Sequence, residues 1–245
     1  MRVLLAVALA ALWPLTAAAQ EPYRGPFTAV EETAAGPLYV TPIYHGSLMF
    51  EFGGLVVHVD PYSRGDYEGL PLADLILLTH HHRDHLDIPL IERLSKPGTI
   101  VVGTEICARQ LPGIQVIGNG ESGTFAGVAV EAVPAYNIVR ERSPGLKYHP
   151  RGEGNGYVID FGGLRVYVAG DTECIPEMDQ LGPVDIAFLP CNLPYTMPAE
   201  EAAECARRIR PRIFYPYHQG DTDPNRLAEL LADEPEIEVR ALPLH

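Results

Sequence analysis

The chain has 245 residues, of which 18 are Lys or Arg and 32 are Asp or Glu, giving a formal net charge of −14 at pH 7. An acidic surface repels nucleic-acid phosphates and anionic lipid headgroups, so these partners are disfavoured and a small-molecule substrate is expected. Hydrophobic residues make up 47% of the sequence and charged residues 20%, which is typical of a folded globular protein and excludes a disordered chain.

The N-terminal segment has the pattern of a secretory signal peptide. Arg2 precedes an apolar run over residues 3–12, and Ala17 to Ala19 supply the small residues that cleavage requires. The run is too short to span a bilayer, although an N-terminal anchor or a buried helix is the alternative interpretation. We expect residues 1–19 to be removed and residues 20–245 to form one domain. The mature protein would then be exported to the periplasm or the extracellular space, with no membrane partner.

The first half of the chain predicts a β-rich unit with two short helices. Apolar and polar residues alternate on both sides of Gly53-Gly54, which is typical of a hairpin with a glycine turn. The continuous apolar run from Leu75 to Thr79 is typical of a strand covered on both faces. In chain order we expect a hairpin over 48–59, strands over 75–79 and 99–102, a helix over 87–94 capped by Asp87, a helix from Thr104 to about residue 110, and a hairpin over 118–131.

The second half begins with a long segment of irregular composition. Residues 134–156 are rich in Pro, Gly and Arg and show little hydrophobic periodicity, so a loop is expected there. Loops of this length in compact domains often carry function. Beyond it we expect strands over 157–169, 185–189, 213–217 and 237–242, and helices over 200–209 and 224–232.

One segment of the first half is repeated in the second. The sequence FGGLVVHV over residues 52–59 matches FGGLRVYV over residues 161–168. Each copy is followed by an apolar strand that opens with aspartate, Asp74 in one case and Asp185 in the other. The repeat predicts two similar halves, each with its own sheet, packed against one another.

The densest chemical signal is THHHRDH, which occupies residues 79–85 directly after a buried strand. Side chains at positions i and i+2 of an extended chain lie on the same side, so His80 and His82 can converge on one ion. Asp84 and His85 come just after and can reach a second ion. Because zinc favours imidazole nitrogen and carboxylate oxygen, we predict a metal centre here rather than a solvated loop.

The pattern His80-x-His82-x-Asp84-His85 after a strand resembles the signature of the metallo-β-lactamase superfamily. Later segments resemble, in their order, motifs of its broad metal-dependent hydrolase branch, which includes ascorbate-phosphate lactonase-like proteins; they are VPAYN at 133–137, NGY at 155–157, AGDT at 169–172 and PYH at 216–218. The resemblance covers nearly the whole mature chain. It implies an α/β fold, a four-layer αβ/βα sandwich of two similar halves with the metal site at one edge.

The resemblance also implies a ligand set for two zinc ions, with iron and manganese as the alternative metals. The implied ligands are His80 and His82 for the first ion, Asp84, His85 and His218 for the second, and Asp171 between the two. The family usually has a third histidine on the first ion, where this chain has Asn137, and asparagine is a poor zinc ligand. His149, in the adjoining loop, could take that place; both alternatives stay open on sequence alone.

The activity that the resemblance implies is hydrolysis. A metal-activated hydroxide would attack an ester, lactone, amide or phosphodiester of a small molecule, and Asp84 would orient the nucleophile and carry its proton. Two alternatives are a di-iron redox protein with the same ligands and a non-catalytic metal-binding protein of the envelope. Among the neighbouring residues, we expect Asp60 to orient ligands through hydrogen bonds, His45 to line the site, Tyr195 to donate a hydrogen bond to a substrate oxyanion, and His81 and Arg83 to face away.

Overall fold

The computed structural model describes residues 21–242 and 244, so the predicted signal segment lies outside the described residues. Its first sheet has seven strands that lie in chain order, antiparallel from β1 to β4 and parallel from β4 to β7. They are β1 (Ala29–Thr33), β2 (Gly36–Tyr44), β3 (Ser47–Phe52), β4 (Leu55–Val59), β5 (Ala73–Leu77), β6 (Ser95–Gly103) and β7 (Gln115–Val116).

The second sheet also has seven strands, in the order β16-β15-β14-β13-β12-β9-β8. It is antiparallel from β8 to β13 and parallel from β13 to β16. Its strands are β8 (Ser122–Phe125), β9 (Val128–Ala135), β12 (Gly154–Phe161), β13 (Leu164–Val168), β14 (Ile186–Pro190), β15 (Ile213–Tyr217) and β16 (Glu238–Val239). Both sheets therefore combine an antiparallel part with a parallel part, as the predicted repeat requires.

The repeated FGGL segments form equivalent turns in the two sheets. Phe52 pairs with Leu55 across the β3–β4 turn, and Phe161 pairs with Leu164 across the β12–β13 turn. Gly53 and Gly54 have φ of 58° and 86°, a left-handed conformation that glycine adopts without strain. In each sheet the second strand of the hairpin then pairs in parallel with the strand at the repeated aspartate, β5 with Asp74 near its start and β14 directly after Asp185.

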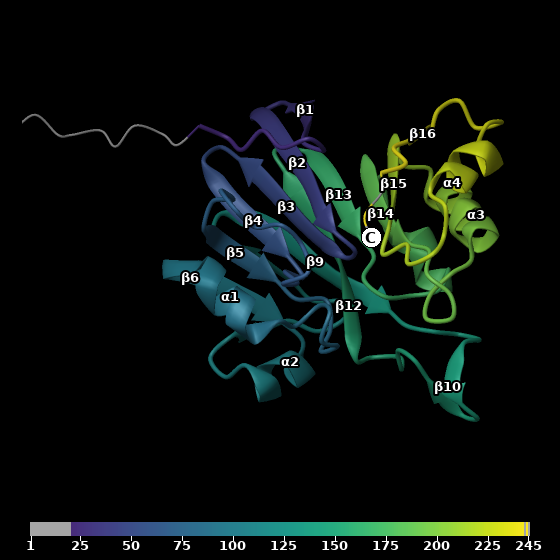
Figure 1. The fold of residues 1–245 in the computed structure, drawn as a ribbon, viewed down its shortest axis with the longest axis horizontal. Helices are drawn as coiled ribbons and strands as arrows, with labels where there is room; N and C mark the ends of the chain where they lie inside the picture. Colours follow the sequence, from purple (N-terminus) through teal and green to yellow (C-terminus); the bar gives the residue numbers. More distant parts are fainter. Residues whose placement is uncertain (1–20, 243, 245) are drawn as a thin grey trace, which may run out of the picture.

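The helices cover the outer faces of the two sheets (Figure 1). They are α1 (Ile88–Leu94) and α2 (Glu105–Gln110) on the first half, and α3 (Ala199–Ile209) and α4 (Asn225–Leu230) on the second. Along β5, Leu75 and Leu77 pack in the core between the sheets, whereas Ile76 packs under α1. The alternation produces four layers, with the two sheets inside and helices outside, and confirms the predicted sandwich.

The two short helices of the first half begin where their caps predict. The Asp87 side chain accepts a hydrogen bond from the backbone N–H of Leu90, and the Thr104 hydroxyl accepts one from the N–H of Cys107. Within residues 21–242, no helix has the length and apolar character needed to cross a membrane.

Two predicted segments differ from the structure. The expected loop over 134–156 contains the end of β9, the start of β12 and a small hairpin, β10 (Glu141–Ser143) with β11 (Leu146–Lys147), which projects from the body of the molecule (Figure 1). Gly145, with φ of 80°, forms its turn. The last strand is limited to β16, because Pro216 in β15 lacks the N–H that a longer ladder would use.

Candidate metal centre

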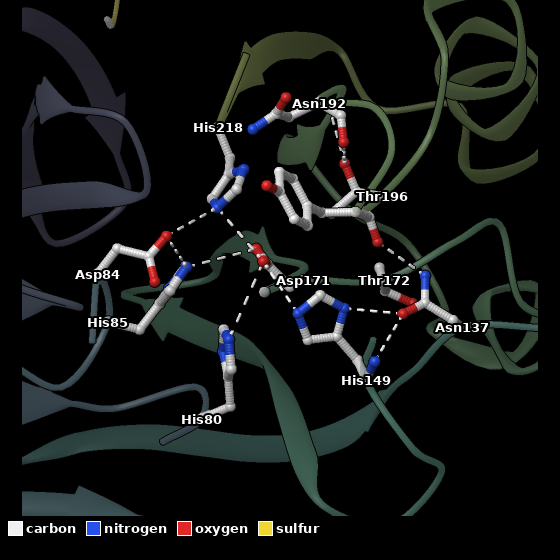
Figure 2. Close-up of polar contacts among 12 residues, drawn as sticks. His80, Asp84, His85, Asn137, His149, Asp171, Thr172, Asn192, Thr196 and His218 are labelled. Atoms are coloured by element: carbon white, nitrogen blue, oxygen red, sulfur yellow. Dashed lines mark hydrogen bonds and ion pairs between the residues drawn. The ribbon is translucent and has the colours of Figure 1, made fainter. Parts of the chain in front are cut away.

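The expected ligands gather at one edge of the sandwich. His80 follows β5, Asp171 follows β13 and His218 follows β15, and these are strands of the parallel parts of the two sheets. In Figure 2 the carboxylate of Asp171 lies in the middle, and the rings of His80, His85, His149 and His218 are arranged around it. The ligands thus come from both halves of the chain.

The Asp171 carboxylate approaches four imidazoles. Its Oδ2 lies 3.2 Å from His149 Nε2, 3.3 Å from His218 Nε2 and 3.9 Å from His80 Nε2. Its Oδ1 lies 3.5 Å from His85 Nε2. Every ring therefore presents the same nitrogen to the centre.

The donor atoms form three overlapping groups. They are His80, His82 and His149; His80, His85 and Asp171; and His45, Asp84 and His218. Within each group the donor atoms lie within 4.8 Å of one another, a separation that one metal ion can bridge. The first group includes His149 and not Asn137. The third includes His45, which sequence reasoning placed only along the wall of the site.

Several of these atoms are buried without a protein partner. Among the described residues, Nε2 of His80, His85 and His218 and Oδ1 of Asp171 accept and donate no hydrogen bond. Buried polar atoms are normally satisfied, so four such atoms in one place call for a further partner. Imidazole nitrogens and a carboxylate oxygen are the donors that zinc and iron prefer, and the residues present therefore fit divalent metal ions.

Burial and neighbouring charges prepare these groups to bind a cation. Burial lowers the pKa of His82 to about 4 and that of His80 well below its usual value, which keeps both rings neutral. Burial opposes charge on Asp171 as well, but His218 and His85 outweigh it and hold the pKa of that carboxyl well below its usual range. The site therefore combines free imidazole lone pairs with an ionised carboxylate.

His85 is oriented by a buried carboxylate behind it. Asp60 Oδ2 lies 2.8 Å from His85 Nδ1 and Asp60 Oδ1 accepts a hydrogen bond of 2.7 Å from the backbone N–H of Thr79. Burial disfavours the charged ring, but Asp171 and Asp60 together raise the pKa of His85 to about 10. The two carboxylates thus favour a positive charge at the His85 ring. A metal ion beside Nε2 would supply that charge in place of a proton. Asp60 acts through hydrogen bonds, as expected.

Asn137 directs His149 toward the centre. Asn137 Oδ1 accepts hydrogen bonds from the backbone N–H of His149 at 2.7 Å and from its Nδ1 at 2.8 Å (Figure 2). The Asn137 Nδ2 group donates to Glu173 Oε1 at 3.1 Å and to the carbonyl of Tyr195 at 2.9 Å. Because both of these partners only accept, the amide orientation is fixed. His149 must then carry its proton on Nδ1 and leave Nε2 free.

Glu173 is a functional support that sequence reasoning missed. Its buried carboxylate accepts hydrogen bonds from three successive backbone N–H groups, those of Ile138, Val139 and Arg140, at 2.7 to 2.9 Å. It also lies 3.1 Å from Arg140 NH1. Glu173 therefore anchors the start of the segment that leads through the β10–β11 hairpin to His149. A single Glu after a Gly-Asp-Thr motif gives no local signal of this role.

The other residues that the sequence analysis placed near the metal centre agree with its expectations only in part. The ring of His45 lies 3.7 Å from that of His218, and its φ of 53° is a left-handed conformation that brings it there. Neither His81 nor Arg83 belongs to a donor group. His81 nevertheless lines a pocket with His80 and His149, and Arg83 lines one with His45 and Asp84, so the expectation that they face away is wrong for both. Tyr195 contacts Asn137 through its carbonyl, and its ring lies exposed against Tyr148.

Two mixed sheets packed face to face with a His/Asp cluster at one edge define the metallo-β-lactamase class of fold. The chain belongs to the β-lactamase superfamily, since the model of the family described as "Beta-lactamase superfamily domain" matches residues 39–218. A UPF0173 metal-dependent hydrolase of Thermococcus onnurineus is 33% identical over 212 residues, which cover 78% of this chain and 92% of that protein.

Solved structures agree with this assignment. A crystal structure from Parabacteroides distasonis, whose name describes a metal-dependent hydrolase, is 44% identical with a TM-score of 0.84, and the match covers 89% of this chain and 99% of that one. The di-iron β-hydroxylase CmlA of Streptomyces venezuelae has a TM-score of 0.63 at 18% identity, and the match covers 84% of this chain and 53% of that one. The second likeness is one of fold alone.

Proposed function

We propose that this protein is a metal-dependent hydrolase that cleaves an ester, lactone, amide or phosphodiester bond in a small molecule. The observation that carries the proposal is the convergence of buried, unpartnered imidazole nitrogens on the Asp171 carboxylate. The relatives named as metal-dependent hydrolases support the reaction type.

The donor groups favour two divalent ions, and zinc suits their chemistry. His80, His82 and His149 would hold the first ion, and Asp84 and His218 the second, with His45 as a further donor beside Asp84. His85, whose Nε2 lies 3.8 Å from Asp84 Oδ2, would also hold the second ion. Asp171 would lie between the two. Bound divalent ions lower the pKa of water to near neutrality and polarise a substrate oxygen. Iron and manganese are the alternative metals.

Asp84 is placed to act on the attacking water. Its carboxylate lies 3.4 Å from His45 Nε2 and 3.6 Å from His218 Nε2, and its side chain is 34% exposed. Burial raises its pKa, but the neighbouring imidazoles of His218 and His45 outweigh that effect and hold the pKa well below its usual range. An ionised Asp84 accepts a hydrogen bond from water and orients the oxygen lone pair toward the substrate. We therefore assign it the role of orienting the nucleophile and receiving its proton.

The same ligands would also serve a di-iron redox protein, and the fold of CmlA gives this second candidate a specific basis. A non-catalytic metal-binding protein of the envelope is the third. We propose export as well, with residues 1–19 as the signal peptide and residues 20–245 as the mature domain in the periplasm or outside the cell.

The test is a hydrolysis screen of ester, lactone, amide, phosphodiester and β-lactam substrates, performed after elemental analysis of the purified protein. We expect zinc as the main metal and activity that Asp84→Ala lowers at least ~100-fold. Asp84→Asn preserves the shape of the side chain and should be similarly impaired. Asp66→Ala, an exposed aspartate outside the donor groups, is the control.

Melting temperatures equal to that of the wild type would exclude misfolding as the cause. An iron-rich protein with redox-active absorption and no hydrolysis would replace this proposal with the di-iron function. A metal-loaded protein inactive in both assays would favour the non-catalytic function.

A further inference from the structure

A pocket adjoins the His45–Asp84 side of the metal centre. It has a volume of about 170 Å³ and is lined by Tyr44, His45, Tyr62, Arg64, Arg83 and Asp84. His45 and Asp84 belong both to this pocket and to the third donor group. A molecule with one group in the pocket can therefore reach the metal centre with its adjoining atoms. Because one water occupies about 30 Å³ of liquid, the pocket has room for a carboxylate or a phosphate.

The two arginines that line this pocket have no carboxylate partner in the described part of the chain. Most Lys and Arg side chains within residues 21–242 form ion pairs with carboxylates, whereas Arg64 and Arg83 form none in that part of the chain. Both are exposed. In a chain with a net charge of −14, two arginines that remain unpaired at the mouth of one pocket concentrate positive potential there.

Two tyrosines connect Arg64 to the donor residue His45 through neighbouring rings. The rings of Tyr44 and Tyr62 lie 6.2 Å apart between centroids, and the guanidinium carbon of Arg64 lies 5.8 Å from the Tyr62 centroid. The aromatic contact limits the conformations of Arg64 without using its N–H donors. Guanidinium groups bind planar oxyanions through paired hydrogen bonds, and the tyrosine hydroxyls supply further donors.

Asp84 is the one pocket-lining residue that opposes an anion. Its carboxylate is, however, within 3.6 Å of the Nε2 atoms of both His45 and His218. A metal ion in that donor group would offset the same charge. The electrostatic balance of the metal-loaded pocket is therefore set by Arg64 and Arg83.

We propose that this pocket is an anion subsite, in which Arg64 and Arg83 bind a carboxylate or phosphate group of the substrate and place its scissile bond at the metal centre. The inference rests on the proposed hydrolase function and narrows its substrate to anionic small molecules. It also gives Arg83, which lies inside the histidine motif, a role distinct from metal binding.

Two measurements on zinc-loaded protein test the subsite. The first compares kcat/KM for mono-nitrophenyl succinate, which carries a carboxylate, and for nitrophenyl butyrate, its neutral counterpart; nitrophenyl 3-phosphonopropionate, an ester with a separate phosphonate, provides the phosphate arm. We expect the wild type to prefer the anionic esters, and Arg64→Gln or Arg83→Gln to lower that preference about tenfold each, since a charged hydrogen bond contributes about that factor. Arg93→Gln, an exposed arginine of α1 outside the pocket, should leave the preference unchanged.

The second measurement needs no turnover. Acetate and methylphosphonate are titrated separately while the Nε–H resonances of the arginines are followed by NMR. We expect saturable shifts at Arg64 and Arg83 and none at Arg93. Tighter binding of acetate would indicate that the substrate carries a carboxylate, and tighter binding of methylphosphonate that it carries a phosphate. Shifts without hydrolysis of any ester would support the subsite while overturning the hydrolase. Hydrolysis with no shifts, and with the same ester preference in both pocket variants, would overturn the subsite alone.

Discussion

Asn137 binds His149 twice, through the backbone N–H and through ring Nδ1, with one amide oxygen. The position where the family resemblance implies a histidine ligand thus holds a side chain that aims another histidine at the same place. The amide oxygen can serve both donors only because Glu173 and the Tyr195 carbonyl occupy the amide nitrogen. Hydrogen bonds of this kind behind a metal ligand fix its tautomer and its orientation.

Asn137→Ala is therefore expected to weaken zinc binding at the His80–His82–His149 group by about 10- to 100-fold, the usual effect of losing such a support. The measurement is zinc competition with a chromophoric chelator, together with the ¹⁵N shifts of the His149 ring, which report the tautomer. Asn225→Ala, an exposed asparagine of α4, is the matched control. Wild-type zinc affinity in the Asn137 variant would show that His149 is held by other contacts.

Asp171 contacts candidate ligands from both halves of the chain. Its loss should therefore reduce the increase in unfolding free energy that zinc produces. Adding zinc at about 100 times its dissociation constant should raise the unfolding free energy of the metal-free wild type by about 2.7 kcal/mol per site. We expect Asp171→Asn to lose most of that increase in thermal unfolding with and without zinc. An equal zinc-dependent increase in the variant would remove Asp171 from the ligand set.

Glu173→Gln should loosen the segment that precedes the β10–β11 hairpin. The amide of glutamine presents N–H groups where three backbone N–H groups now donate to a carboxylate, so about 2 kcal/mol of stability is expected to be lost. Amide hydrogen exchange at residues 138–140 should accelerate. Glu229→Gln, which alters an exposed acid of α4 that pairs with Arg226, should leave that exchange unchanged. Unaltered protection at residues 138–140 in Glu173→Gln would contradict an anchoring role.

His58 predicts a loss of stability in mild acid. Its ring is fully buried in β4, Nε2 donates to the Pro71 carbonyl, and burial lowers its pKa to about 4. The unfolded chain takes up a proton near pH 6.5 but the folded one only near pH 4, so stability is full above about pH 6.5 and declines below it. Between pH 7.5 and 5 the wild type should lose about 2 kcal/mol more than His58→Gln in urea unfolding. Identical pH dependence would contradict this role.

The parts of the fold that can be predicted from the sequence are those determined by residues adjacent in the chain. The FGGL turns, the caps at Asp87 and Thr104 and the apolar run of β5 each depend on local chemistry, and all appear in the structure. The HxHxDH motif likewise predicts a donor cluster after a buried strand. These features need no knowledge of distant contacts.

The rest of the site depends on contacts between distant segments. His149 reaches the centre because an amide fixed by Glu173 and Tyr195 holds it, and no spacing rule contains that relationship. Arg83 was expected to face away on the alternation of an extended chain. The chain instead turns at this point, where the N–H of His85 donates to the carbonyl of His82, and alternation no longer applies.

The division of the donor groups between the two halves has a consequence for assembly. His80, from the first half, can share an ion with His149 or with Asp171, from the second, only when the sheets are docked in their final positions. A bound ion would close a long chain loop, as a disulfide does. Metal binding would then occur only after the two sheets have packed together. A chain in which only one sheet has formed would bind little metal.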